Sequence, residues 1–240
     1  MSNIEKFLEM VQESDNIVFF GGAGVSTESG IPDFRSVDGL YNQKYDYPPE
    51  TILSHTFYMR HTEEFYRFYR DKMLCLDAKP NVTHQKLAEL EAAGKVKAVI
   101  TQNIDGLHQM AGSRRVLELH GSVHRNYCQK WGKGFDAEYI LKSGTEIPLC
   151  DACGGKIKPD VVLYEEGLNQ QTLEDAVFYI SHADVLIIGG TSLAVYPAAG
   201  LIDYYRGNKL VLINKSTTPM DGRADLLIQA GLGEVFSQIR

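Results

Sequence analysis

The sequence predicts an α/β fold, a parallel sheet with helices on both faces. Short runs of β-branched and other apolar residues alternate with helix-like segments, which is typical of parallel strands joined by crossover helices. The runs occupy residues 16–24, 97–103, 183–192 and 209–214. Their apolar content is nearly continuous, as expected for strands covered on both faces. Each run ends in small or polar residues, so we expect polar side chains to gather at one edge of the sheet.

Helices are expected before and between these strands. Residues 83–95 have a helical pattern, and Gly94 near their end fits a C-cap. Residues 194–207 are expected to form a helix that packs on the sheet, and residues 1–14 an amphipathic helix.

Two regions interrupt the alternation. Residues 36–80 are rich in Tyr, Phe, Pro and His, whereas residues 122–161 hold three of the four cysteines and show little apolar periodicity. Neither region can bury a core alone, so we interpret both as insertions that together form a small domain, with a helical part and a degenerate zinc-ribbon part. The remaining residues, 1–35, 81–121 and 162–240, are predicted to form a Rossmann-like domain.

Composition and charge narrow the functional class. The chain has 240 residues, 44% of them hydrophobic and 23% charged, and a net charge of −7. Nucleic acid and anionic membranes are therefore not expected as partners, since both require clustered Lys and Arg. No apolar run approaches the roughly 20 residues of a membrane span. With no signal-peptide pattern and few cysteines, we expect a cytoplasmic protein.

The segment GGAGVSTESGIPDFR, residues 21–35, follows the first predicted strand. Its glycines would let backbone N–H groups approach a phosphate, with Arg35 available to the same group. It is not the G-x-G-x-x-G of dehydrogenases, because Gly22 and Gly24 are followed by Thr27. Taken alone, the segment is also compatible with a glycine turn of purely structural role.

Polar residues also follow the second strand, in the segment TQNIDGLH. Gln102, Asn103 and Asp105 combine two amides and a carboxylate, which suits the recognition of hydroxyl and carboxamide groups, although a capped polar turn explains them equally well. His120 ends a short strand before a glycine, where a lone histidine is more often structural than catalytic. A catalytic role requires that all of these segments face one cleft.

In this order along the chain, the segments resemble the sirtuin family of NAD-dependent protein-lysine deacylases. The resemblance covers GAGVSTESGIPDFR, TQNIDGLH, HGS, the cysteine region, KPDVVLYEEGL, GTSLAVYPAAG and LIN. Each segment is weak evidence alone, but the ordered series is highly specific. It implies NAD-dependent deacetylation of protein lysines, with nicotinamide and O-acetyl-ADP-ribose as the other products.

The resemblance also implies roles for individual residues. His120 and Asn103 would be catalytic, with His120 acting as the base that deprotonates a ribose hydroxyl. Asn214 would meet the adenosine ribose and Leu232 the adenine. The full set expected to bind NAD comprises Gly22, Ala23, Gly24, Thr27, Asp33, Phe34, Arg35, Gln102, Asn103, Ile104, Asp105, His120, Gly190, Thr191, Ser192, Asn214 and Leu232.

The expected partner is an acetylated-lysine protein or peptide, bound as an extended strand between residues 160–166 and 191–197. The family's usual Phe-Gly-Glu is replaced here by Tyr164, Glu165 and Glu166, which adds a charge near the mouth of the acyl-lysine tunnel. Relatives that remove succinyl groups have a Tyr-x-x-Arg pair in the tunnel. The pair would here be Tyr66 and Tyr69, with Arg70 one position off, so an acidic acyl group would lack its cation.

The family's small domain holds a structural zinc ion on two C-x-x-C pairs. Cys128, Cys150 and Cys153 stand at matching positions, but Trp131 replaces the fourth cysteine. Structural zinc requires a closed tetrahedron of ligands. Two interpretations remain open. Either zinc binds weakly with a water, His124 or another molecule as fourth ligand, or the module has no metal and Trp131 fills its space.

Three other functions are considered. A sirtuin-fold ADP-ribosyltransferase would use the same cofactor with a different acceptor, but His120 favours deacylation. A non-catalytic NAD-sensing module is disfavoured only by the full catalytic set. A nicotinamide dehydrogenase is disfavoured by Thr27 and by the lack of an acidic residue at the end of a second strand.

Overall fold

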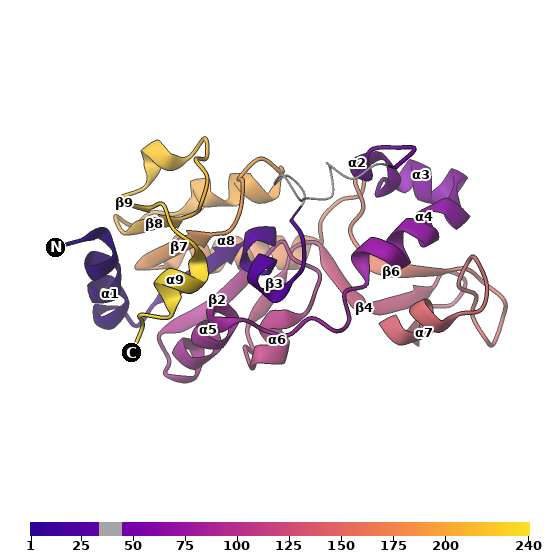
Figure 1. The fold of residues 1–240 in the computed structure, drawn as a ribbon, viewed down its shortest axis with the longest axis horizontal. Helices are drawn as coiled ribbons and strands as arrows, with labels where there is room; N and C mark the ends of the chain where they lie inside the picture. The colour runs from indigo at the N-terminus through magenta and orange to yellow at the C-terminus, as the bar shows by residue number, and fades with distance from the viewer. Residues whose placement is uncertain (34–44) are drawn as a thin grey trace.

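The computed structural model describes residues 1–33 and 45–240 of the chain. A large sheet and a small sheet lie beside each other along the long axis of the molecule (Figure 1). All strand pairs of the large sheet are parallel, as the sequence predicted. Its strands lie in the order β3 (Val116–Glu118), β2 (Val96–Thr101), β1 (Ile17–Gly21), β7 (Val185–Gly189), β8 (Leu210–Ile213) and β9 (Leu226–Ile228).

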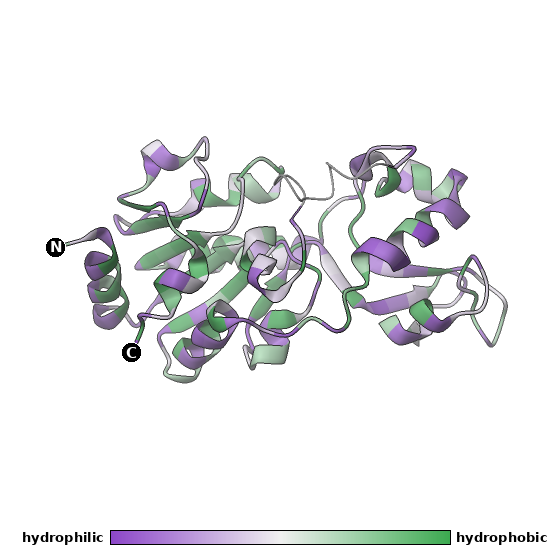
Figure 2. Cartoon of the chain, viewed as in Figure 1, coloured by the Kyte–Doolittle hydropathy of each residue, from purple (hydrophilic) through white to green (hydrophobic). Residues whose placement is uncertain are grey.

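Helices cover both faces of the large sheet because alternate strand residues point to opposite sides. Phe19 and Ile187 pack in one core cluster, and their neighbours Phe20 and Ile188 pack in another. Figure 2 shows the strands as an apolar layer between helices whose outer faces are hydrophilic. One face is covered by α1 (Asn3–Glu13), α5 (Val82–Ala92) and α9 (Leu232–Phe236), and the other by α8 (Gln170–His182) and η5 (Ala198–Tyr204).

The predicted helix at residues 194–207 is shorter than expected, and it is a 3₁₀-helix. It begins after Pro197, and Gly200 donates its backbone N–H to the Pro197 carbonyl at 3.0 Å. Glycine inside the segment lowers its helix propensity, which favours the tighter and shorter form. Other short helical elements are η1 (Ala23–Val25), η2 (Thr27–Ser29), α6 (Leu107–Ala111) and η6 (Asp221–Arg223).

The second sheet belongs to what we call the small lobe, residues 45–76 and 121–163. Its antiparallel order is β5 (Gly134–Phe135), β4 (Gly121–Cys128) and β6 (Ile157–Val161). The sequence analysis missed β4, whose exposed His and Arg residues hide its alternation. The helices of the small lobe are α2 (Pro49–Ile52), α3 (His55–Arg60), α4 (Thr62–Phe68), the π-helical turn η4 (Tyr69–Met73) and α7 (Ala137–Lys142).

Both insertions contribute to one core in the small lobe. Tyr58, Phe65, Tyr66 and Tyr69 are fully buried there with residues of β4 and β6. The Tyr66 hydroxyl donates a hydrogen bond to the Ile157 carbonyl, which ties the helices to the sheet. The shared core fits the interpretation that the two insertions together form one small domain. The boundaries given above for these insertions remain predictions. No helix in the described ranges is long and apolar enough to cross a membrane.

Candidate active site

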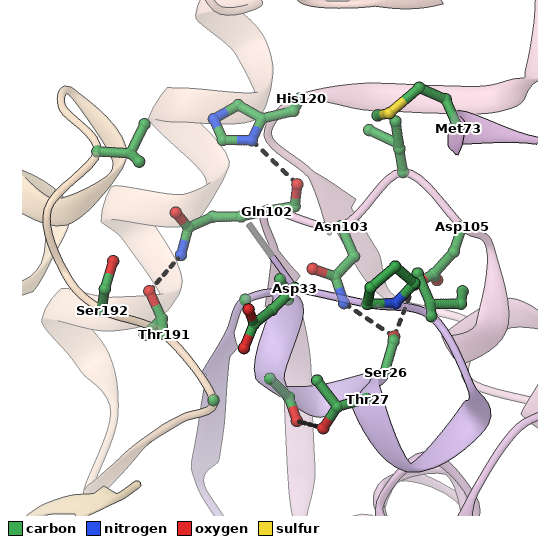
Figure 3. A pocket seen from close by; sticks show the side chains of 18 of the residues that line it. Ser26, Thr27, Asp33, Met73, Gln102, Asn103, Asp105, His120, Thr191 and Ser192 are labelled. Atoms are coloured by element: carbon green, nitrogen blue, oxygen red, sulfur yellow. Dashed lines mark hydrogen bonds between the residues drawn. The ribbon is translucent and has the colours of Figure 1, made fainter. Parts of the chain in front are cut away.

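The site lies where the strand order of the large sheet reverses. The chain continues from β1 to β2 on one side and from β7 to β8 on the other, so the carboxyl ends of β1 and β7 form a switch point. Ligands of open α/β sheets bind at such points. A cleft of about 620 Å³ lies here, between the strand ends and the small lobe (Figure 3). Its volume is in the range of small-molecule and cofactor sites.

Two glycine-containing turns form the floor of the cleft. The Gly24 N–H donates to the Gly190 carbonyl at 2.8 Å. A Cβ atom on Gly24 would lie 2.8 Å from the Gly190 Cα, and Gly190 itself has a φ of +61°. Glycine is therefore required on both sides of this contact, because backbone lies directly on backbone. The absence of side chains leaves room for a ligand's phosphate groups to approach the backbone.

A short hydrogen-bond chain orients the polar residues after β2. The Asn103 side-chain amide donates to the Ser26 hydroxyl at 3.0 Å, and this hydroxyl donates to Asp105 Oδ2 at 2.6 Å. Asp105 Oδ1 accepts the Leu107 backbone N–H at 2.9 Å. Both carboxylate oxygens of Asp105 are thus engaged, which fixes the group at the cleft wall. The arrangement presents amide and carboxylate groups to a polar ligand (Figure 3).

A second set of contacts joins the ends of β2, β7 and β8. Gln102 Nε2 donates to the Thr191 hydroxyl at 3.0 Å, and Asn214 Nδ2 donates to the Thr191 carbonyl at 2.9 Å. These bonds hold three strand ends in one arc along the cleft. Hydroxyl and amide groups in this arc match the hydrogen-bonding needs of ribose hydroxyls.

His120 lies at the end of this polar wall. Its Nδ1 lies 2.9 Å from the Gln102 carbonyl, so Nδ1 carries the proton and donates it, and Nε2 is left as the acceptor. Burial lowers the pKa of His120, although the bond to the Gln102 carbonyl opposes the shift. The ring is therefore neutral near pH 7. The following Gly121 has a φ of +75°, and a side chain there would collide with the Asp160 carbonyl, so glycine is needed to bring β4 onto β6 beside the histidine.

The structure brings the residues predicted for NAD into one cleft. Every one of them within the described ranges lines it, whereas Phe34 and Arg35 lie outside the described residues. Their individual roles stay predictions. The residues that line the cleft are Gly22, Ala23, Gly24, Thr27, Asp33, Gln102, Asn103, Ile104, Asp105, His120, Gly190, Thr191, Ser192, Asn214 and Leu232.

The sequence analysis missed several residues that shape the cleft. Ser26 connects Asn103 with Asp105, and Glu28 accepts the Gly233 N–H at 3.2 Å, which joins the glycine turn to α9. Both lie inside the segment quoted above, yet nothing in their local pattern distinguishes them from ordinary loop residues. Lys72 also lines the cleft from the small lobe.

Residues of both segments predicted to hold a peptide line the cleft. Glu165 has a φ of +75°, a conformation that favours the glycine for which it substitutes. Its carboxylate accepts the Thr56 backbone N–H at 2.8 Å at the start of α3, which offsets part of the strain. Glu166 pairs with His55 at 2.8 Å and with Lys158 at 3.1 Å. These contacts fasten the wall of the cleft to the small lobe.

The prediction that Tyr66 and Tyr69 line the acyl tunnel is wrong. Both side chains are fully buried in the small-lobe core and neither lines the cleft. The Arg70 guanidinium donates to the carbonyls of Ile140, Thr145 and Glu146 within the small lobe, so it is not directed at an acyl group in the cleft. In their place the next turn of chain reaches the cleft, with Lys72, Met73, Cys75 and Leu76.

Three thiols converge at the tip of the small lobe. The Sγ atoms of Cys128, Cys150 and Cys153 lie within 4.8 Å of one another, and Cys128 and Cys153 are 3.5 Å apart. Two similar turns carry them. Gly132 donates its N–H to the Cys128 carbonyl and Gly154 to the Cys150 carbonyl, both at 2.8 Å. The turn after Cys128 therefore has the same backbone hydrogen bond as the turn after Cys150, although Trp131 occupies the position where a fourth cysteine would complete the metal site.

The structure argues against the metal-free interpretation in which Trp131 fills the space of a metal ion. Its side chain is 60% exposed, and its indole N–H donates to Cys150 Sγ at 3.4 Å. His124 is directed elsewhere, since its Nε2 contacts the Asp105 carbonyl at 2.9 Å. The residues present therefore fit three corners of a zinc tetrahedron, and the fourth ligand would come from solvent or another molecule.

The fold and the cleft define an α/β protein of the nucleotide-binding class with a neutral histidine in the cleft. A model of the Sir2 family matches residues 22–197. A Clostridium acetobutylicum protein called NAD-dependent protein deacetylase is 61% identical over 241 residues, which cover 100% of this chain and 98% of that protein. A Cutibacterium acnes protein of the same name is 52% identical over 238 residues, which cover 98% and 97%. The chain belongs to the Sir2 family.

Solved structures of the family agree in fold over nearly the whole chain. A structure described as Sir2 with a p53 peptide and NAD+ gives a TM-score of 0.88 at 42% identity, covering 100% of this chain and 97% of that one. A Sir2 variant with a deacetylated p53 peptide and 3′-O-acetyl ADP ribose gives a TM-score of 0.91 at 42% identity, covering 98% and 96%.

Replacing Trp131 by cysteine should complete the zinc site. The turn that carries Trp131 already matches the turn that carries Cys153, so the new thiol would close the tetrahedron. We expect zinc affinity and melting temperature to rise together, because metal binding contributes to folding. Metal analysis and thermal unfolding with and without chelator measure both. Replacing the similarly exposed Tyr127 by cysteine is the control, and a zinc ion that resists chelation in the wild type would contradict the three-ligand site.

Proposed function

We propose that this chain is an NAD-dependent protein-lysine deacetylase. The observation that carries the proposal is the convergence of Gln102, Asn103, Asp105 and His120 on one cleft at the switch point of the sheet. Relatives named NAD-dependent protein deacetylase, which match the chain from end to end, support it. The cytoplasm is the proposed location, because a cluster of unpaired thiols suits a reducing compartment.

The glycine turns and the polar arc are assigned to NAD. Bound NAD supplies the ADP-ribosyl group that takes over the acetyl group as nicotinamide leaves. The turn at Gly24 approaches the phosphate groups with its backbone. Asn103 and Asp105, fixed through Ser26, hold the nicotinamide end, and Asn214 holds the far ribose. Holding the reacting groups in one geometry lowers the entropic part of the barrier.

His120 is assigned as the general base. Its Nε2 would accept a proton from a ribose hydroxyl of the bound cofactor, while Nδ1 keeps its own proton on the Gln102 carbonyl. Burial favours the neutral ring, which is the form able to accept a proton. The second assigned catalytic residue is Asn103, whose amide is oriented by Ser26 and thus positions the reacting end of the ligand.

The protein substrate is assigned to the outer cleft. Residues of both segments, 161–166 and 191–197, line the cleft, so an extended peptide can pair with them through its backbone and place its acetyl-lysine in the cleft. A backbone-dominated contact gives affinity with little sequence preference. A sirtuin-fold ADP-ribosyltransferase stays the second candidate, because the same cleft would serve it. Mass analysis of the peptide after incubation with NAD separates the two, since only one of them adds ADP-ribose to the protein.

Replacing His120 by alanine should reduce deacetylation by several orders of magnitude while NAD binding stays within a few-fold, because the ring acts as a base and not as an anchor. Turnover of an acetyl-lysine peptide and the Kd for NAD measure the two effects. His182→Ala, an exposed histidine at the end of α8, serves as the matched control. Near wild-type turnover of the His120 variant would contradict the assignment of His120 as the general base.

The acid limb of the pH–rate profile should lie below the ordinary histidine pKa of about 6.5. Burial lowers the pKa of His120, so the base stays neutral until the solution is more acidic than that value. The midpoint of log kcat/KM against pH measures it, and a midpoint above 6.5 contradicts the assignment.

The stability of the fold should also fall as the pH is lowered, so it has to be measured at each pH of the rate profile. Burial also lowers the pKa of His84 to about 4 and that of His108 to about 3. The unfolded chain then binds more protons than the folded one below about pH 6.5, so stability falls with falling pH. Melting temperatures at each pH separate this loss of fold from protonation of the base.

Acetyl-lysine peptides should be processed far better than succinyl-lysine peptides. Lys72 is the cation that the described part of the small lobe places in the cleft, and its Nζ already pairs with Asp71 at 3.1 Å. A succinyl carboxylate would find no unpaired cation from the described part of the small lobe, and a buried unpaired charge is strongly unfavourable. The values of kcat/KM on paired peptides test this, and Asp71→Asn should raise the succinyl rate by releasing Lys72. Equal wild-type efficiencies on the two peptides would refute the expectation.

A further inference from the structure

Asn81 connects the start of α5 with the glycine turn after β1. Its Oδ1 accepts the Thr83 backbone N–H at 2.9 Å, which caps the helix. Its Nδ2 donates to the Val25 carbonyl at 2.8 Å and to the Ser29 hydroxyl at 2.9 Å. One side chain therefore serves two elements, with its oxygen on the helix and its nitrogen on the turn.

The backbone of Asn81 is itself held in place. Its N–H donates to His84 Nδ1 at 3.2 Å, which completes a capping box. The His84 ring is fully buried and packs edge-on against the buried His108 ring at 4.6 Å. The amide of Asn81 is thus presented to the glycine turn from a rigid base, since α5 packs on the large sheet.

The glycine turn depends on contacts of this kind. It consists of two single 3₁₀ turns, η1 and η2, and such turns are not stable alone. On the side of the strand ends it is held by the bond between Gly24 and Gly190 and by Ser26 on Asp105. On the opposite side Asn81 reaches both 3₁₀ turns, because Val25 belongs to η1 and Ser29 to η2.

We propose that Asn81 is a positioning residue for the cofactor, which holds the glycine turn in its binding-competent form through the two bonds of its Nδ2. The inference rests on the proposed function, in which this turn meets NAD. If the turn were competent for only a tenth of the time, the apparent Kd for NAD would rise about tenfold. Once NAD is bound it holds the turn itself, so the loss appears in KM for NAD and not in kcat.

Asn81→Asp separates the two duties of the side chain. Asparagine and aspartate cap helices about equally well, so the bond to Thr83 survives. We call the two bonds from Nδ2 to Val25 and Ser29 the clamp. The second carboxylate oxygen cannot donate and would face the Val25 carbonyl, so the clamp loses its bond to Val25 and keeps at most a bond donated by the Ser29 hydroxyl. We expect the Kd and KM for NAD to rise about tenfold, which corresponds to about 1.4 kcal/mol. The value of kcat at saturating NAD should stay within about twofold.

A matched control is the same substitution at another cap. Asn169 caps α8 through its Oδ1, which accepts the Thr172 N–H at 3.0 Å, and its side chain does not line the cleft. Asn169→Asp should leave the Kd for NAD unchanged. Ser29→Ala removes one acceptor of the clamp and leaves the cap of α5 intact, so it should raise the Kd to a smaller extent even if Asn81→Asp weakens the fold.

The binding constants are measured by calorimetry, and amide hydrogen exchange of residues 23–30 is measured without NAD. Faster exchange in Asn81→Asp than in Asn169→Asp, together with the higher Kd, supports the clamp. Wild-type Kd and wild-type exchange in both Asn81→Asp and Ser29→Ala would overturn it. A wild-type protein that binds no NAD would overturn the proposed function instead, and the exchange data would still decide whether Asn81 holds the turn.

Discussion

The loops after β1 and β7 lie so close together that neither Gly24 nor Gly190 has room for a side chain. This contact sets the geometry of the whole site, because the two strands are neighbours at the switch point although they are distant in sequence. With backbone against backbone, the ends of β2 and β8 can close in from the two sides. The polar arc through Gln102, Thr191 and Asn214 joins the ends of these neighbouring strands.

The same closeness explains why the site is assembled largely from short contacts between strand ends. Gln102, Asn103 and Thr191, which take part in the bonds through Ser26 and Thr191, closely follow β2 and β7, so the sheet fixes the backbone near these residues. Little conformational entropy is then left to lose when a ligand binds, which favours affinity. The exception is the outer part of the glycine turn, which leaves the sheet and needs its own support from Glu28 and Asn81.

The sequence predicts the four central strands β2, β1, β7 and β8 well because burial on both faces leaves a continuous apolar run in each of them, whereas the edge strand β9 was not predicted. The site residues are predictable for a related reason, since polar residues that directly follow such runs must lie at one edge. Contacts between distant segments have no comparable local signal. Ser26 is 79 residues from Asp105, and Asn81 is 56 residues from Val25. In the local pattern one is a loop serine and the other an ordinary helix cap.

The small lobe was predicted less well, and its composition explains why. Strand β4 exposes the adjacent residues His124 and Arg125 within the register shift between Ser122 and Asn126, so its period is hidden. The tyrosines near the predicted acyl tunnel were assigned from the resemblance to relatives with a Tyr-x-x-Arg pair, but a matching position does not say which face a short helix buries. Tyr66 and Tyr69 face inward and pack with aliphatic residues of β4 and β6 in the core of the lobe. The turn after them then reaches the cleft instead.

That aromatic core also bears on the missing fourth cysteine. A structural metal is needed most where a small module cannot bury enough apolar surface. Here Tyr58, Phe65 and Tyr69 form a continuous set of ring contacts, with centroids 5.0 and 5.5 Å apart. Phe65 also packs on Tyr66, which bonds to the strand that follows the cysteine turns. Large buried rings of this kind supply much of the stability of a small core. The cysteine turns can therefore exchange one metal ligand for an exposed tryptophan without loss of the fold, because the lobe is held from its helical side.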